Sequence, residues 1–503
     1  MQIAPSSDDF VRVYAQGEAQ PVWTTLVADL ETPVSAFLKI AVGRPMSFLL
    51  ESVEGGAVRG RYSVIGLDPD VIWRAQGKRA EINRTPQSKS DGFAPCQEPP
   101  LAALRSLLAE SRMTLPESLP PMAAGVFGYL GYDMVRLMEN LPAEKPDPIG
   151  IPDAVLIRPT LVVVFDAVKD TITVVTPVRP QSGVSAAAAY QRAAQRLAAV
   201  VKALDRPLEK TPAPDPGPPA AAPASNTTPA EYRAMVLKAK EYIHAGDIFQ
   251  VVLSQRFEAP FTLSPFALYR ALRRVNPSPY LYFLDYGDFA VAGSSPEILV
   301  KVRNGVVTIR PIAGTRPRGR TPNEDKALEQ ELLADPKERA EHLMLLDLGR
   351  NDVGRVAEIG TVTVTDQFFV ERYSHVMHIV SNVEGRLAPQ YDALDALIAG
   401  FPAGTVSGAP KIRAMQIIDE LEKEKRGIYA GAVGYFSAAG EMDSCIVLRT
   451  ALIKGGKMYV QAGAGIVADS NPHAEQTECV NKARALFQAA EEARRFAGGD
   501  KRG

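Results

Sequence analysis

The stretch EILVKVRNGVVTIRPIAGTR, residues 297–316, predicts a β-hairpin and with it the class of fold. Two apolar runs flank Asn304-Gly305, a pair that is typical of two-residue hairpin turns because both positions adopt positive φ. With that turn, Ser295 faces Gly314 across the hairpin, and Glu297 lies two residues nearer the turn. We therefore expect a carboxylate to meet a Gly-Thr pair at the open end of an antiparallel hairpin.

A second hairpin is predicted at Gly455-Gly456, and it places Arg449 beside residues 463–465 of the returning strand. A looser turn at residues 438–441 brings Tyr429 alongside Arg449, with Tyr435 predicted on the same strand as Tyr429. A guanidinium, a phenol and a glycine-rich edge could hold a small carboxylate. The pattern fits equally well a surface arginine near glycines that ease the twist of a sheet.

Patterns outside these hairpins predict the rest of an α+β fold. Strands are expected at residues 46–50 and 62–65, and a further hairpin around Lys169-Asp170. Residues 186–204 predict an alanine-rich helix, and Thr228-Pro229-Ala230-Glu231 is a typical helix start with an N-cap, an N1 proline and a capping glutamate. Strands and helices alternate without strict βαβ units, so we expect antiparallel sheets covered by helices.

One segment interrupts this pattern. Residues 206–229 are rich in proline and alanine and predict a semi-rigid, extended connector. The chain is thereby divided into an N-terminal region, residues 1–205, and a C-terminal region, residues 230–503.

Composition narrows the function classes. The 503 residues include 56 lysines and arginines against 58 aspartates and glutamates, a formal charge of −2. A nearly neutral chain has no general electrostatic reason to bind nucleic acid or an anionic membrane, so neither partner is expected. No secretory signal, no membrane-spanning run and only three cysteines are apparent, which predicts a cytoplasmic protein with reduced thiols.

Two predicted helix starts carry paired acids. Glu338 and Glu341 follow Asp335-Pro336, and Glu475 and Glu478 repeat the i, i+3 spacing after Asn471-Pro472, so each pair lies on one helix face. Four carboxylates from two helices could bind Mg²⁺. Acids are also common in first turns because they interact favourably with the helix dipole, and on spacing alone that explanation leads.

Five histidines are present, and His378 lies in the apolar, strand-like run YSHVMHIVSNV. A histidine placed there could exchange a proton near neutral pH. A hydrogen-bonded core histidine is the more common outcome for such a residue.

Six longer motifs occur in one order along the chain. They are PIAGT (311–315), EHLMLLDLGRND (341–352), VMHIVS (376–381), FPAGTVSGAPK (401–411), GAVGYF (431–436) and QAGAGIVADS (461–470). Together they resemble the chorismate-utilising enzymes, and within them the anthranilate synthase component I family. The resemblance covers almost the whole chain apart from the connector, and it implies antiparallel sheets packed as a sandwich under helices.

The resemblance implies conversion of chorismate and ammonia to anthranilate and pyruvate, the first committed step of tryptophan biosynthesis. It implies Mg²⁺ bound by Glu341 and Glu478, with Glu338 and Glu475 completing an acidic cage. Glu297 and His378 match the positions that carry out acid–base work in the family, and Lys411 is a weaker candidate for the substrate site. The residues implied to bind chorismate are Gly314, Thr315, Thr405, Tyr429, Arg449, Gly463, Ala464 and Gly465.

Resemblance further implies feedback inhibition by L-tryptophan. The matching positions are Glu51, Ser52, Pro279, Tyr280, Leu281, Val433 and Tyr435. Many relatives have methionine where Leu281 stands; because leucine and methionine have similar volumes, we expect binding to persist.

Two alternative functions remain open: aminodeoxychorismate synthesis and tryptophan binding without catalysis. Aminodeoxychorismate synthases typically carry a nucleophilic lysine where this chain has Ala313, which cannot attack the ring. A catalytically silent, tryptophan-binding subunit is disfavoured because the acids, the arginine and the histidine are all retained. No cysteine lies in the glycine-flanked elbow of an amidotransferase, so we expect a separate glutaminase subunit, and hence a hetero-oligomer, to supply ammonia.

Overall fold

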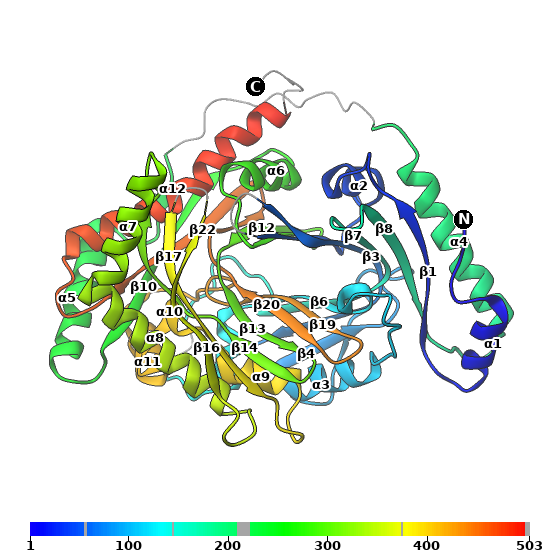
Figure 1. Cartoon of the computed structure of the whole chain (residues 1–503), viewed down its shortest axis with the longest axis horizontal. Helices are drawn as coiled ribbons and strands as arrows, with labels where there is room; N and C mark the ends of the chain where they lie inside the picture. The colour runs from blue at the N-terminus through cyan, green and yellow to red at the C-terminus, as the bar shows by residue number, and fades with distance from the viewer. Residues whose placement is uncertain (55–57, 143–144, 209–221, 374–375, 498–503) are drawn as a thin grey trace.

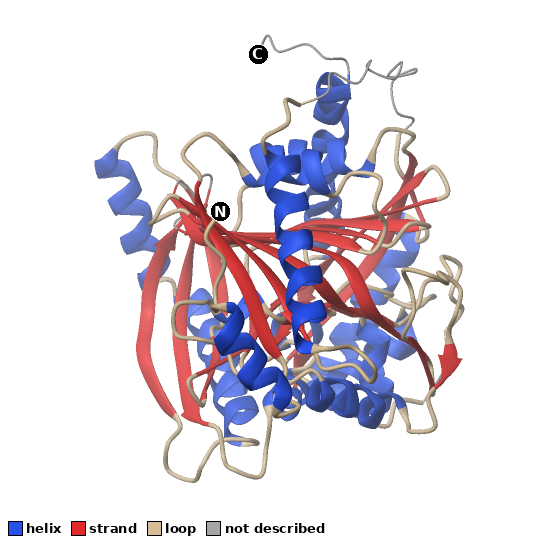
Figure 2. Ribbon diagram, turned by 90° about the vertical axis from the view of Figure 1, so that its right-hand side faces the viewer, coloured by secondary structure: helices blue, strands red, loops and turns tan. Residues whose placement is uncertain are grey.

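A computed structural model describes residues 1–54, 58–142, 145–208, 222–373 and 376–497. It confirms the α+β class: every ladder between its described strands is antiparallel. The strands form two large sheets with helices on their outer faces (Figures 1 and 2). Within the described residues, no helix is both long and apolar enough to cross a membrane.

The first sheet runs from the C-terminal region into the N-terminal region. Neighbour by neighbour, its strands are β9 (Ala224–Ser225), β10 (Gln250–Pro260), β22 (Lys457–Ile466), β21 (Thr450–Lys454), β12 (Phe289–Ser295), β11 (Tyr280–Asp285), β2 (Ser47–Glu54), β3 (Val58–Gln76), β7 (Ala154–Asp166), β8 (Thr171–Val178) and β1 (Gln20–Val27). The short β18 (Gly408–Ala409) also pairs with β10.

The second sheet shares β3 and β7 with the first. Its strands follow in the order β5 (Ala94–Pro95), β4 (Arg79–Asn83), β3, β7, β6 (Gly125–Leu130), β19 (Ala432–Ser437), β20 (Met442–Ile446), β13 (Ile298–Arg303), β14 (Val306–Ile309) and β17 (Val376–Arg386). Strands β15 (Ile312–Pro317) and β16 (Thr363–Arg372) also pair with β17.

The long strands β3 and β7 carry the chain from one sheet to the other. Residues 58–66 of β3 pair with β2, whereas residues 72–76 pair with β4, and the register shifts between Pro69 and Val71. A shift of this kind bends a strand and increases its twist.

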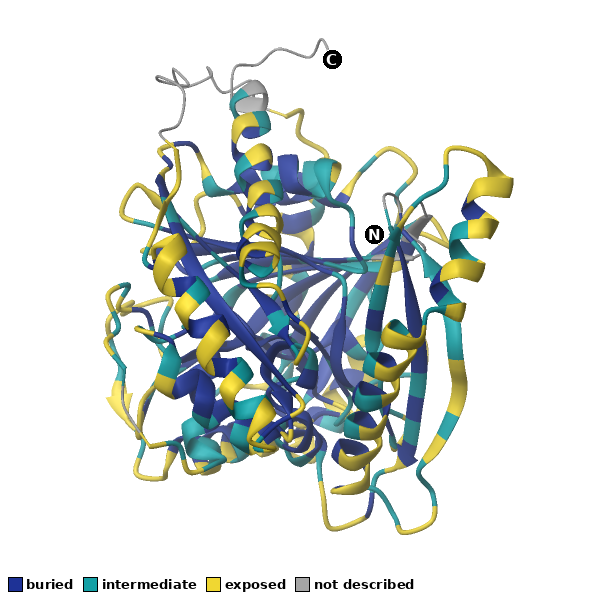
Figure 3. Ribbon diagram, turned by 90° about the vertical axis from the view of Figure 1, so that its left-hand side faces the viewer, coloured by how far each residue is buried: buried dark blue, intermediate teal, exposed yellow. Residues whose placement is uncertain are grey.

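Helices cover the sheets on their outer faces, with α6 and α12 packed against β12 and β22. Figure 3 shows strands buried between helices whose outward faces are exposed. The helices are α1 (Ser7–Ala15), α2 (Pro33–Ile40), α3 (Pro100–Glu110), α4 (Ala186–Leu204), α5 (Pro229–His244), α6 (Pro265–Val275), α7 (Pro322–Ala334), α8 (Pro336–Gly354), α9 (Ala393–Gly400), α10 (Gly404–Ser407), α11 (Lys411–Leu421) and α12 (Pro472–Ala497), with 3₁₀ turns at Pro121–Ala123 and Tyr132–Leu137.

Most of the core among the described residues falls into two large clusters, because central strands bury both faces. On β11, Leu281 belongs to the cluster beneath the helices and Tyr282 to the cluster between the sheets. Phe48 of β2 stacks on Phe127 of β6 across the sheets, with ring centroids 4.5 Å apart. The sandwich expected from the resemblance is therefore present.

Local predictions from the sequence are confirmed. The helix at 186–204 has those bounds, and Thr228 and Glu231 form a reciprocal capping box at the start of α5. The turns at Asn304-Gly305 and Gly455-Gly456 produce the expected pairings, such as Val302 with Val307.

Two predictions beyond the turns are wrong. Ser295 does not face Gly314, because the hairpin ladder ends at the pair Lys301 and Thr308 and β15 pairs with β17 instead. Pro311 has no N–H with which to continue the first ladder, and Gly314, at φ +75°, lies where the register of β15 shifts. Tyr429 is not on the strand of Tyr435, since β19 begins only at Ala432.

The predicted connector lies partly outside the described residues, at 209–221. On either side of it the chain contributes to the same sheets: β2 pairs with β11, and β6 pairs with β19. The division into regions 1–205 and 230–503 stays a prediction.

Candidate functional site

The Arg449 cavity, about 740 Å³, lies beside the N-terminal half of α12. It is lined by Arg449 between β20 and β21, by Val376 of β17, by Asn276 at the end of α6, and by Glu478 and Lys482 of α12. Two residues predicted for substrate and metal binding, Arg449 and Glu478, therefore come from separate elements and lie around one opening.

Glu297 is buried just before β13, with 7% of its surface exposed. The hydroxyl of Thr405 on α10 donates to its carboxylate at 3.1 and 3.2 Å. Burial raises the pKa of Glu297 to about 8, although Thr405, the Ile312 N–H and the charge of Arg449 all act to lower it. At neutral pH this side chain is therefore mainly a protonated acid.

His378 on β17 is buried and lies opposite Thr315 of β15. Its Nδ1 is 3.0 Å from the Gly314 carbonyl oxygen and 3.0 Å from the Thr315 hydroxyl. Because a carbonyl can only accept a hydrogen bond, Nδ1 carries the hydrogen, which leaves a lone pair on Nε2 of the neutral ring. Burial, assisted by the charge of Arg449, lowers the pKa of His378 to about 4.

The charge of Arg449 acts on both Glu297 and His378. Burial lowers the pKa of its guanidinium, while Tyr373 and Glu297 act to raise it. Its backbone has φ +47°, a conformation that non-glycine residues rarely adopt. The site thus combines a neutral acid, a neutral imidazole and a cation, in which the acid and the imidazole have pKa values shifted in opposite directions.

The glycine-rich edge of β22 is closely packed. A Cβ at Gly463 would lie 2.7 Å from the Leu253 carbonyl oxygen and 3.0 Å from the Tyr429 hydroxyl, and one at Gly465 would lie 2.5 Å from Gln250 Nε2. The Gly463 carbonyl accepts from Lys482 Nζ at 3.0 Å. Ala464, between the two glycines, is fully buried.

Three of the four predicted metal ligands have other side-chain partners. Glu338 pairs with Arg316 at 3.0 Å, Glu341 accepts from Gln250 Nε2 at 3.2 Å, and Glu478 pairs with Lys482 at 2.7 Å. Of the residues that the structure describes, no three histidines, cysteines or acids are close enough together to hold an ion as they stand.

These acids nevertheless influence one another. Burial raises the pKa of Glu341, and the charges of Glu338 and Glu478 raise it further. Burial and the charge of Glu478 likewise raise the pKa of Glu475. The two helix faces therefore concentrate negative charge in one region.

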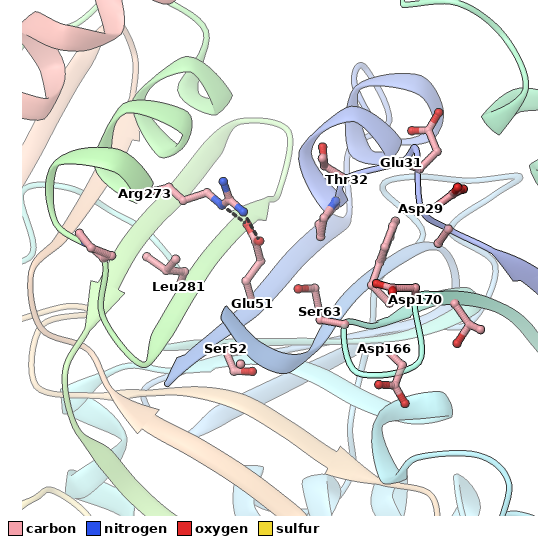
Figure 4. A pocket seen from close by; sticks show the side chains of 17 residues that line it. Asp29, Glu31, Thr32, Glu51, Ser52, Ser63, Asp166, Asp170, Arg273 and Leu281 are labelled. Atoms are coloured by element: carbon pink, nitrogen blue, oxygen red, sulfur yellow. Dashed lines mark hydrogen bonds and ion pairs between the residues drawn. The ribbon is translucent and has the colours of Figure 1, made fainter. Parts of the chain in front are cut away.

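The second opening, the Glu51 cavity, measures about 390 Å³ and lies between α6, β2 and the β7–β8 turn (Figure 4). Glu51, Ser52 and Leu281 line it. Glu51 accepts two hydrogen bonds from Arg273 at 2.8 and 3.0 Å, and one from the Tyr269 hydroxyl at 2.6 Å.

The other predicted inhibitor residues do not line this cavity. Tyr280 lies opposite Ser52, and its hydroxyl points to Asp443 at 3.4 Å. Val433 and Tyr435 of β19 are buried between the sheets. Pro279 precedes β11 and is half-buried. The seven residues thus divide between the two faces of the β2–β11 ladder.

Lys411 is not in either cavity. It forms a buried ion pair with Asp352 at 2.7 Å, which gives it a structural partner away from both openings.

Sequence reasoning missed several contacts around the candidate residues. Gln250 touches Glu341, Arg316 holds Glu338, the Tyr373 ring lies 5.5 Å from that of His378, and Arg273 holds Glu51. Arg316 directly follows PIAGT and Tyr373 begins the run YSHVMHIVSNV, whereas Gln250 and Arg273 come from segments that carry no signal of their own.

Comparison with known proteins identifies the family of this chain. The family model described as chorismate binding enzyme matches residues 54–488. Anthranilate synthase component 1 of Cereibacter sphaeroides is 58% identical over 98% of both chains, and that of Thermus thermophilus is 48% identical over 94% of this chain and 98% of its own.

Solved structures agree as well. Anthranilate synthase component I from Streptococcus pneumoniae matches with a TM-score of 0.75 and 38% identity, covering 92% of this chain and 98% of that one. The menaquinone-specific isochorismate synthase of Escherichia coli shares the fold, with a TM-score of 0.69 at 21% identity. The chain therefore belongs to the chorismate-binding enzyme family, in its anthranilate synthase component I branch.

Proposed function

We propose that this chain converts chorismate and ammonia to anthranilate and pyruvate, with ammonia supplied by a glutaminase subunit and with feedback inhibition by L-tryptophan. The observation that carries the proposal is the oppositely shifted pair Glu297 and His378 near Arg449. Addition of ammonia to the ring with loss of a hydroxyl needs a proton donor, a proton acceptor and a cation that holds the substrate carboxylate in place. Glu297, His378 and Arg449 supply these in that order.

Glu297 is the proposed proton donor. Hydroxide is a poor leaving group, so the C4 hydroxyl of chorismate must be protonated as it departs. With a pKa of about 8, Glu297 is roughly nine tenths protonated at pH 7. The Thr405 hydroxyl and the Ile312 N–H fix the orientation of the carboxyl group.

His378 is the proposed proton acceptor. Its pKa of about 4 keeps the ring neutral, and the Gly314 carbonyl selects the tautomer with the lone pair on Nε2. Thr315 completes the orientation of the ring from the neighbouring strand.

Arg449 is proposed to bind a carboxylate of chorismate, because a guanidinium binds carboxylates through two parallel hydrogen bonds. We also keep Tyr429, Gly463, Ala464 and Gly465 as proposed chorismate contacts, on the strength of the resemblance; in the structure the two glycines give room to the Leu253 carbonyl, the Tyr429 hydroxyl and the Gln250 amide.

The acidic residues fit Mg²⁺ by their chemistry. All four are hard oxygen donors, and the Oε1 of Gln250, whose amide touches Glu341, is buried without a hydrogen-bond partner among the described residues. We propose that Glu341 and Glu478 hold the ion, with Glu338 and Glu475 beside them. When bound, Mg²⁺ would neutralise the ring carboxylate and draw negative charge from the ring.

A partner subunit is proposed because the cysteines of this chain are not suited to release ammonia from glutamine. Cys96 is partly exposed, Cys445 and Cys479 are buried, and burial raises the pKa of all three thiols. None of them is therefore an activated nucleophile for glutamine hydrolysis. The relatives are named as component 1, which indicates an enzyme of several components, and we propose that a glutamine amidotransferase is the second.

For inhibition, we propose that L-tryptophan binds at the β2–β11 ladder. Glu51 and Leu281 lie opposite each other and face the Glu51 cavity. Ser52 also lines it but lies opposite Tyr280, which packs with Val433 and Tyr435 between the sheets, and Pro279 directly precedes β11.

The test is anthranilate fluorescence after mixing the purified chain with chorismate, Mg²⁺ and an ammonium salt. We expect product without any added protein, loss of product with L-tryptophan, and no product when glutamine replaces ammonium. Product that becomes 4-aminobenzoate only with a lyase would show aminodeoxychorismate synthesis, which Ala313 disfavours. Tryptophan binding without turnover would show a silent regulatory subunit.

A further inference from the structure

A single row of residues across the first sheet joins the Glu51 cavity to Arg449. Glu51 on β2 lies directly opposite Leu281 on β11, and Leu281 lies opposite Ser294 on β12. The Ser294 N–H donates to the Arg449 carbonyl at 3.2 Å. Since adjacent strands lie about 4.8 Å apart, this row spans only about 14 Å.

Helix α6 covers this row and reaches both cavities with consecutive residues. Pro277 lines the Glu51 cavity, whereas Asn276, the C-cap of α6, lines the Arg449 cavity. Arg273, one turn earlier, is bound to Glu51 through two hydrogen bonds. A shift of this turn therefore changes both openings together.

Ser294 connects the helix turn to the sheet row. Its hydroxyl donates to the Asn276 carbonyl, while its N–H holds the Arg449 carbonyl. Ser294 is fully buried and, among the described residues, belongs to the lining of neither cavity. Its hydrogen bonds to Asn276 and Arg449 therefore give it a route to the Arg449 cavity, and its cross-strand partner Leu281 gives it one to the Glu51 cavity.

Arg449 is suited to respond to such a shift. Its left-handed φ of +47° is costly for a residue with a side chain, so surrounding contacts must hold it. Helix α6 also packs against α12, which carries Glu478 and Lys482 of the same cavity.

We propose that Arg273 and Ser294 couple the Glu51 cavity to Arg449, with Arg273 setting the position of the α6 turn and Ser294 transmitting it to the Arg449 backbone. This rests on the proposed function, in which L-tryptophan occupies the region of Glu51 and chorismate occupies the Arg449 cavity. Ser294 is a positioning residue, since it touches neither ligand.

The physical basis is competition for Glu51. Its carboxylate already accepts three hydrogen bonds from Arg273 and Tyr269 of α6, so a ligand ammonium drawn to it competes with the Arg273 guanidinium for the same negative charge. Inhibitor binding then favours a different position of the α6 turn, and by linkage chorismate and tryptophan must weaken each other by the same factor.

The experiment measures that factor in the full chain, in Arg273→Gln and in Ser294→Ala. The KM for chorismate is determined with and without saturating L-tryptophan, and tryptophan binding is measured directly by calorimetry with and without chorismate. In both variants we expect tryptophan still to bind, while the coupling factor falls by about threefold to tenfold. Ser294→Thr, which retains the hydroxyl, should restore it.

Ser437→Ala is the matched control, because it also removes a buried hydroxyl that donates to a backbone carbonyl, here Pro121 at 2.7 Å. An unchanged coupling factor in Ser294→Ala, or an equal loss in Ser437→Ala, overturns the proposal. Loss of tryptophan binding in Arg273→Gln makes that residue a ligand contact and also overturns it. A parent chain that neither binds nor responds to tryptophan refutes the proposed regulation itself, which is a separate outcome.

Discussion

Replacing Glu297 by glutamine should make the protein more stable at neutral pH and nearly inactive. In the folded state the pKa of this carboxyl is about 8, so it stays protonated up to about that pH, whereas a glutamate in the unfolded chain has a pKa of 4.5. Folding therefore takes up a proton between those values, and rising pH destabilises the parent fold across that window. Glutamine has nearly the same shape and cannot ionise, so the stability of the variant does not fall in this way as the pH rises.

The magnitude follows from the pKa shift. Each pH unit between the two pKa values costs about 1.4 kcal/mol, so the variant should gain about 3 kcal/mol on the parent at pH 7. Between pH 5 and pH 8 the difference should widen by about 3 to 4 kcal/mol. For a chain of 503 residues this corresponds to a difference in Tm that grows by about 3 °C.

Thermal unfolding of Glu297→Gln and the parent, measured side by side from pH 5 to pH 8, tests this. Exposed Glu117→Gln controls for removal of a carboxylate in general. Anthranilate formation should fall about a hundredfold to ten-thousandfold, as expected for loss of a general acid. A stability difference that stays constant with pH, or a variant that keeps its activity, would refute the assignment of Glu297 as a protonated general acid.

Further predictions concern the rest of the site. At constant free ammonia, kcat/KM for chorismate should fall as pH rises through about 8, where Glu297 loses its proton, and a profile that continues to rise would contradict that assignment. Arg449→Gln should raise the KM for chorismate about tenfold to a hundredfold, measured by initial rates. Glu341→Gln should shift the Mg²⁺ dependence of activity to higher concentration, and an unaltered titration curve would remove it from the metal site. Ser52→Ala should weaken inhibition by tryptophan with little change in maximal rate, so an unchanged inhibition curve would count against the assigned region.

Elements set by short-range chemistry could be predicted from the sequence. The capping box of Thr228 and Glu231 and the turn at Asn304-Gly305 depend on residues within a few positions of each other. The same is true of the acidic faces on α8 and α12, because helical spacing alone places each pair together.

Long-range pairing could not be predicted in this way. Pro311 and Gly314 indicate that the first ladder is interrupted, but nothing in the sequence shows that β15 pairs with β17 instead. Likewise, the partners of Glu51 come from a helix more than 200 residues away, and only the fold brings Arg273 and Tyr269 to it. The shifted pKa values of Glu297 and His378 depend on burial, which single-sequence patterns do not reveal.

The ladders β2–β11 and β6–β19 have a consequence for how this protein can be divided. A nick within the proline-rich segment would leave two fragments that still complete each other's sheets. Discarding the N-terminal fragment would instead bare the backbone edges of β11 and β19, which then become templates for intermolecular strand pairing and aggregation. The N-terminal region is therefore part of the sheets themselves, and its loss would expose an edge strand in each of them.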